Sequence, residues 1–100
     1  MKIIIDGKRY DTETATKVDS ITNVYNHGDG FYEDTQIYRT KSGNWFLAGR
    51  GGGASRWSTS TGSDGSGIRP IDAAEAQKFL EREGNVAAIE KYFQDCVKDA

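Results

Sequence analysis

The sequence predicts an α+β domain in which a small antiparallel β-sheet packs against two C-terminal helices. Before Pro70, runs of β-branched and aromatic residues alternate with turn residues, which is typical of short strands. After Pro70, apolar residues recur at helical spacing in two stretches. Because 100 residues is the length of one ordinary domain, we expect residues 1–100 to form a single α+β domain with three to five strands and a short N-terminal helix.

The N-terminal residues predict a β-hairpin followed by this helix. The isoleucines of Lys2–Asp6 favour a strand, Asp6-Gly7 favours a turn, and Lys8–Tyr10 can pair back. From about Thr12 to Ser20 we expect a short helix, because Asp11 or Thr12 can cap its first turn. Its apolar residues recur at helical spacing at Ala15, Val18 and Ile21.

A second hairpin is expected in the middle of the chain. Thr35–Thr40 and Trp45–Gly49 are β-rich runs, and Gly43 between them can take the positive φ of a bulged turn. Both runs carry apolar residues on both faces, so we place this hairpin in the middle of the sheet. Arg56–Thr61 suits an outer strand, and Gly62–Gly67 suits a flexible loop.

The last third predicts two short amphipathic helices. Asp72 and Asn85 are placed as N-terminal caps, and Gly84 is placed to end the first helix. The expected buried face of the first helix comprises Ala73, Ala76, Phe79 and Leu80, and that of the second comprises Val86, Ile89, Phe93 and Cys96.

Residues Gly49–Ala54 match the pattern G-x-G-x-x-A, in which a glycine-rich loop binds a dinucleotide pyrophosphate. Such a site also needs a helix directly after the loop, with its N-terminus toward the phosphates. The residues that follow are rich in Ser, Thr and Gly and make a poor helix. We therefore interpret Gly49–Gly53 as a turn or bulge that lets the chain approach its neighbours closely.

Residues suited to catalysis or metal binding are sparse. His27 is the single histidine, and a metal site there would need carboxylates such as Asp29, Glu33 and Asp34, which in a loop more often only solvate a turn. Cys96 lies on the apolar stripe of the last helix, where a thiol usually behaves as a small buried hydrophobe. We expect a protein that is not an enzyme and that uses no cofactor and no metal ion.

The lone cysteine also excludes an internal disulfide, and no apolar run approaches the roughly 18 residues of a membrane span. We expect a cytoplasmic protein with no membrane partner.

Charge is unevenly distributed, although the net charge is only −2. Residues 35–63 hold no acidic residue, whereas seven acids and four bases lie between Asp72 and the end. Aromatic residues and cations interleave in the basic segment, as in surfaces that bind single-stranded nucleic acid. The competing interpretation, in which the aromatics fill the core, is favoured because a small domain needs them inside. The aromatic residues are Tyr38, Trp45, Phe46 and Trp57, and the cations are Arg39, Lys41, Arg50 and Arg56.

Three blocks of sequence, taken in order, resemble a family of short bacterial proteins carried by phages, plasmids and related mobile elements. The blocks are GKRYDTETATKV (7–18), YRTKSGNWFLAGRGGGASRWS (38–58) and GIRPIDAAEAQKFLE (67–81). Some proteins of this kind resemble anti-CRISPR inhibitors, which block a CRISPR–Cas effector by binding it. The helix expected from Asn85 to Val97 lies outside the matching pattern, and the family pattern supplies no catalytic residue.

The resemblance implies an anti-CRISPR-type protein of a phage or mobile element, active in the bacterial host cytoplasm. It would bind a CRISPR–Cas effector and block its nucleic-acid binding or activity. One alternative is a small nucleic-acid-binding or regulatory domain that uses the basic–aromatic sheet surface, and a second is an assembly factor that oligomerises. The candidate partner-binding residues, expected to be exposed, are Arg50, Arg56 and Trp57 near the glycine run and Glu75, Glu81 and Glu83 on the acidic helix.

Overall fold

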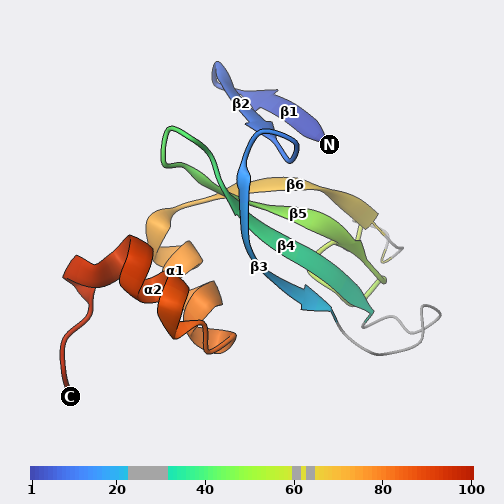
Figure 1. Ribbon diagram of the computed structural model, residues 1–100. Coiled ribbons are helices and arrows are strands. Elements are labelled where there is room, and N and C mark those ends of the chain that lie inside the picture. Colours follow the sequence, from blue (N-terminus) through green and yellow to red (C-terminus); the bar gives the residue numbers. More distant parts are fainter. Residues whose placement is uncertain (23–31, 60–61, 63–64) are drawn as a thin grey trace.

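The protein has an α+β fold, as the sequence predicts, with two antiparallel sheets and two C-terminal helices (Figure 1). The computed structural model describes residues 1–22, 32–59, 62 and 65–100. The strands are β1 (Lys2–Ile5), β2 (Lys8–Asp11), β3 (Thr16–Thr22), β4 (Glu33–Arg39), β5 (Trp45–Gly51) and β6 (Gly65–Ile71). The helices are α1 (Ala73–Arg82) and α2 (Val86–Phe93), and a short 3₁₀ turn, η1 (Gln94–Cys96), follows them.

Strands β1 and β2 form the predicted N-terminal hairpin. Ile5 pairs with Lys8, so the connection is a two-residue turn. Both central residues have positive φ, 51° at Asp6 and 75° at Gly7. A two-residue connection with positive φ at both positions is a type I′ turn, whose twist matches that of the flanking strands. Asp-Gly is favoured in such a turn because both residues tolerate positive φ.

The larger sheet has four antiparallel strands in the order β3-β4-β5-β6, so each strand pairs with its neighbour in the chain. Strands β4 and β5 occupy the centre, which confirms the position predicted for the second hairpin. Gly43 closes this hairpin with φ 91°, and the amide of Thr40 donates to the carbonyl of Asn44 at 2.7 Å. The conformational freedom of glycine is therefore used in the turn, as the sequence indicates.

The helix predicted over residues 12–20 is wrong. Asp11 does cap a turn, because its Oδ1 accepts from the amide of Glu13 at 2.9 Å, but β3 begins only a few residues later. A register shift between Lys17 and Asp19 places Val18 and Ile21 against the same core cluster. The shift gives two residues on one face of a strand a spacing of three, which resembles the spacing of a helix.

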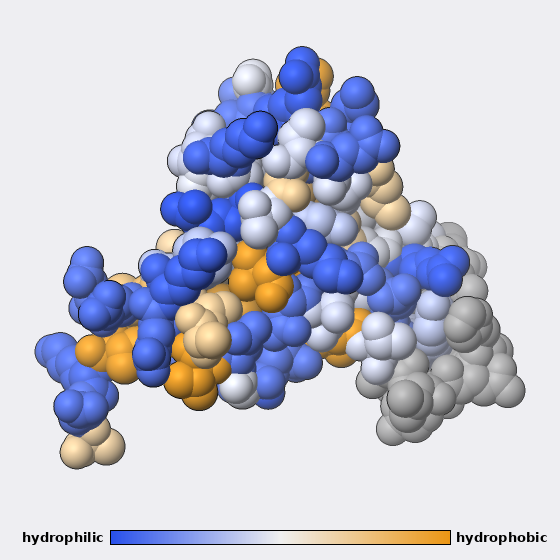
Figure 2. All heavy atoms as spheres, in the orientation of Figure 1, coloured by the Kyte–Doolittle hydropathy of each residue, from blue (hydrophilic) through white to orange (hydrophobic). Residues whose placement is uncertain are grey.

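The large sheet lies between the helices and the N-terminal hairpin (Figure 1). On one face, the core includes Ile37, Trp45 and Leu47 from the sheet and packs against apolar residues of α1 and α2. On the other face, Phe46 and Ala48 pack with residues of the hairpin. Hydrophilic side chains cover most of the surface seen in Figure 2, and apolar ones gather over the two helices.

The predicted helix caps are confirmed. Oδ1 of Asp72 accepts from the amide of Glu75 at 2.8 Å, and Oδ1 of Asn85 accepts from the amide of Ala88 at 3.0 Å. Gly84 ends the first helix with φ 66°. Asp72 and Asn85 each satisfy an amide that has no partner within its helix.

The predicted apolar stripe of the second helix is wrong at both ends. Val86 is 61% exposed, and Cys96 is also exposed. The α-helix ends at Phe93 and the chain continues as a 3₁₀ turn, so the helical spacing does not extend to Cys96. The buried residues of α2 are Ala88 and Phe93, with Ile89 and Tyr92 packed beside them.

The region between β5 and β6 also differs from expectation. Residues 56–59 form a turn and irregular backbone instead of the predicted outer strand, and β6 begins at Gly65, inside the predicted flexible loop. Gly49 and Gly51 belong to β5, so only the later part of the glycine run bends the chain. In the part of the chain that the structure describes, no helix is long and apolar enough to cross a membrane.

Candidate functional site

The segment 52–59 turns back after β5 and lies against the sheet, over strands that contain glycine. A Cβ atom added at Gly65 would collide with the carbonyl oxygen of Trp57, and one added at Gly51 would collide with the hydroxyl of Ser55. The strand glycines are therefore required for close approach of this segment, which is the structural role predicted for the glycine run.

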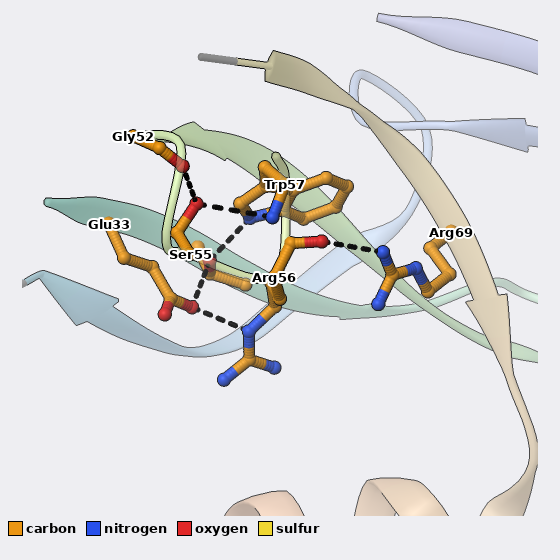
Figure 3. A network of polar contacts seen from close by, with 7 residues as sticks. Glu33, Gly52, Ser55, Arg56, Trp57 and Arg69 are labelled. Atoms are coloured by element: carbon orange, nitrogen blue, oxygen red, sulfur yellow. Dashed lines mark hydrogen bonds and ion pairs between the residues drawn. The ribbon is translucent and has the colours of Figure 1, made fainter. Parts of the chain in front are cut away.

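Hydrogen bonds anchor the segment to the sheet (Figure 3). The amide of Gly52 donates to the carbonyl of Tyr32 at 2.8 Å. The hydroxyl of Ser55 donates to the carbonyl of Gly52 at 2.7 Å and accepts from the amide of Trp57 at 3.2 Å. These bonds fix the backbone from which the side chains of Arg56 and Trp57 extend.

Trp57 is 7% exposed, so the expectation that it lies on the surface is wrong. Its Nε1 donates to the hydroxyl of Thr35 at 2.7 Å, and that hydroxyl donates to Oε2 of Glu33 at 2.6 Å. A buried indole N–H needs such an acceptor. Trp57 is thus a core residue, and its hydrogen bond to Thr35 attaches the 52–59 segment to β4.

Two arginines are held in place by this same arrangement. Nε of Arg56 lies 2.6 Å from Oε2 of Glu33, and its guanidinium group lies 5.7 Å from the centre of the Phe79 ring. Nη2 of Arg69 donates to the carbonyl of Arg56 at 2.7 Å, and its guanidinium group lies 5.3 Å from the centre of the Trp57 indole. In Figure 3 the terminal nitrogens of Arg56 extend beyond Glu33, away from the sheet.

Both arginines line a pocket of about 200 Å³ between helix α1 and the sheet, which we call the basic pocket. The helix contributes residues that are three, four and seven positions apart and therefore lie on one face. Buried Leu47 and Phe79 and half-buried Ile71 form its apolar part. The complete lining is Leu47, Arg56, Arg69, Ile71, Glu75, Lys78, Phe79 and Arg82.

The structure brings together only two of the six predicted partner-binding residues, Arg56 and Glu75, both at the basic pocket. Arg50 is exposed on β5, and strand alternation places it on the hairpin side of the sheet. Glu81 and Glu83 are exposed at the C-terminal end of α1, and Oε1 of Glu81 accepts from Gln77 at 3.2 Å.

The basic–aromatic sheet surface does not form as an exposed aromatic platform. Trp45 is 5% exposed and Phe46 is fully buried, and together with Trp57 they belong to the core. Arg39 lies over the rings of Trp45 and Tyr92, at 5.9 and 5.1 Å from their centres. The interpretation that the aromatics fill the core is confirmed for Trp45, Phe46 and Trp57, whereas Tyr38 is half-buried and stacks on Phe46.

Sequence reasoning missed Arg69, Lys78 and Arg82 as members of one site. Lys78 and Arg82 are four residues apart on a predicted helix, so their shared face was detectable from the sequence. The place of Arg69 at this site was not detectable from the sequence, because it depends on the turn at 52–59 and on the buried Trp57.

Within the described residues there is no group of three or more His, Cys, Asp or Glu residues that could hold a metal ion. His27 and Asp29 lie outside the described residues. A comparison of the chain with protein-family models, curated proteins and solved structures finds no match.

Proposed function

We propose that the protein is a non-enzymatic inhibitor that binds a CRISPR–Cas effector and blocks its nucleic-acid binding or activity. The assignment to CRISPR–Cas rests on the resemblance of the three sequence blocks to proteins of mobile elements. The observation that carries a binding role is the basic pocket, in which two arginines are held in position by Glu33 and by the backbone of the 52–59 segment.

The chemistry of the pocket supports binding rather than catalysis. Guanidinium groups stay protonated and donate hydrogen bonds, so they recognise anions but do not serve as bases or nucleophiles at neutral pH. Half-buried Arg56 and exposed Arg69 each already contact a polar oxygen and an aromatic ring before any partner arrives, which lowers the entropy that binding must overcome. An anionic group on a partner is therefore the natural occupant.

The alternative of a nucleic-acid-binding domain that uses the sheet surface has less support. Three of its four proposed stacking residues, Trp45, Phe46 and Trp57, are buried and cannot stack on unpaired bases without unfolding the core, which leaves only half-buried Tyr38. We therefore favour a protein as the partner.

The proposal is tested by affinity capture with the tagged protein from bacterial lysates that carry different CRISPR–Cas systems, with and without nuclease treatment. Recovery of a Cas effector that survives nuclease, together with loss of interference in cells that express the protein, is the expected result. Recovery of nucleic acid alone, or of partners that disappear after nuclease treatment, would contradict the proposal.

A further inference from the structure

The basic pocket has an excess of positive charge that two carboxylates, Glu75 in its lining and Glu33 beside Arg56, offset only in part. Its lining contains four cations and one carboxylate, Glu75, although the whole chain carries a net charge of −2. Within the described residues, the single ion pair joins Arg56 to Glu33, so Arg69, Lys78 and Arg82 have no carboxylate within 4.0 Å. Positive charge gathered in a concave site attracts anions and raises their local concentration.

The two arginines on the sheet side are more than solvated surface charges. Arg56 is restrained by Glu33 and by the Phe79 ring, and Arg69 is restrained by the Arg56 carbonyl and the Trp57 ring. An arginine fork that is already oriented loses little freedom when it binds a carboxylate or phosphate through two parallel hydrogen bonds. The opposite wall is supplied by Lys78 and Arg82 of α1.

The shape and lining of the pocket favour one inserted side chain over a long polymer. Its volume of about 200 Å³ is below the usual size of a site for a whole small-molecule ligand. Apolar atoms of Leu47, Ile71 and Phe79 lie beside the cations, so an aliphatic stem with an anionic end matches the lining. A nucleic-acid backbone would instead require a row of cations along a groove, together with exposed rings.

We infer that the basic pocket receives the carboxylate side chain of an acidic segment on the protein partner. The inference rests on the proposed function, because it names the chemistry of the surface through which a Cas effector would be held. Arg56 and Arg69 bind the carboxylate oxygens, Lys78 and Arg82 contribute attraction from α1, and the apolar lining contacts the stem.

The test is a nuclear magnetic resonance titration of the isotope-labelled protein with a blocked hexaglutamate peptide. We expect shifts of the Nε–Hε signals of Arg56 and Arg69 and of the α1 amides. A hexaglutamine peptide should leave them unchanged.

The variant Lys78→Gln/Arg82→Gln should weaken binding of hexaglutamate by about tenfold, since two charge contacts are removed. The matched control is Lys8→Gln/Arg9→Gln on the N-terminal hairpin, which removes the same charge from exposed positions elsewhere and should bind as tightly as the wild type.

Two results would overturn the inference. The first is that the shifted signals belong to residues outside the pocket, or that the affinity for hexaglutamate falls equally in both double variants. Either outcome would indicate diffuse electrostatic attraction. The second is tighter binding in the pocket of a single-stranded thymidine oligonucleotide than of hexaglutamate at the same salt concentration, which would assign the site to phosphates.

The outcome is separable from that of the proposed function. Capture of a Cas effector with equal efficiency by the wild type and by Lys78→Gln/Arg82→Gln would support the function and reject the pocket as its site. Binding of hexaglutamate in the pocket without capture of any Cas effector would support the inference about acidic segments and reject CRISPR–Cas as the target.

Discussion

The two faces of the large sheet carry arginines in very different settings. On the helix face, Arg56 and Arg69 each contact both a polar oxygen and an aromatic ring. On the hairpin face, Arg50 is exposed, and no ion pair joins it to any residue within the described ranges. All three arginines are equally cationic in the sequence, and Arg50 and Arg69 are both exposed, yet among the described residues contacts orient only Arg56 and Arg69.

This difference shows what turns a surface charge into a candidate binding site. A solvated arginine must lose its side-chain freedom when a partner binds, which offsets much of the attraction. On the helix face that freedom is already restricted during folding, by the buried Trp57 and by Glu33. Four substitutions test this contrast, and their expected effects on stability decrease from Trp57 to Arg50.

Trp57→Ala should cause the largest loss, about 3–5 kcal/mol of unfolding free energy, because it empties a buried aromatic site and removes a hydrogen-bond donor to Thr35. Urea denaturation followed by circular dichroism measures the loss. Trp57→Phe keeps most of the ring and should cost less than the alanine variant. An alanine variant as stable as the wild type would show that segment 52–59 is not anchored by this side chain.

Gly65→Ala should destabilise the domain by about 1–3 kcal/mol, since the added methyl group meets the backbone carbonyl of Trp57. Thermal unfolding gives the comparison, with Ser66→Ala on the same strand as the control. If Gly65→Ala and Ser66→Ala both have the melting temperature of the wild type, segment 52–59 does not lie against β6 as described.

Glu33→Gln should cost about 1 kcal/mol, a small value because the ion pair with Arg56 is partly exposed. Its larger effect should fall on the basic pocket, because Arg56 loses the carboxylate that orients it. We expect weaker binding of hexaglutamate, and a stability difference from the wild type that shrinks at high salt. Unchanged peptide affinity would mean that the ion pair does not organise the pocket.

Arg50→Gln should change stability by no more than about 0.5 kcal/mol, as is usual for an exposed position that forms no ion pair with the described residues. Partner capture should also be unaffected, because Arg50 lies on the hairpin side of the sheet. Reduced capture by this variant, with normal stability, would move the binding surface to the opposite face.

Local chemistry made much of the fold predictable from the sequence. The Asp6-Gly7 turn, the Gly43 turn and the caps at Asp72 and Asn85 depend on neighbouring residues, and each was found as expected. The helix predicted over residues 12–20 is wrong because a bulge in β3 places Val18 and Ile21, three positions apart, on the same face of a strand. That spacing depends on pairing with β4, which the local sequence does not reveal.

The candidate site was less predictable because it joins distant parts of the chain. The sequence predicts Arg56 and Glu75 to be exposed charges, but their meeting at one pocket depends on how segment 52–59 folds over the sheet. The same fold buries Trp57, which resembled a surface residue only because it lies between glycines, serines and a cation. Long-range packing therefore explains both why Arg56 and Glu75 meet at the basic pocket and why Trp57 is buried.

The most direct measurement is the affinity of the captured partner for the wild type, for Lys78→Gln/Arg82→Gln and for Arg50→Gln, measured side by side by isothermal titration calorimetry. We predict about a tenfold loss for the pocket variant, as for removal of two charge contacts, and wild-type affinity for Arg50→Gln. Equal affinity of all three, or a loss confined to Arg50→Gln, would contradict the assignment of partner binding to the helix face.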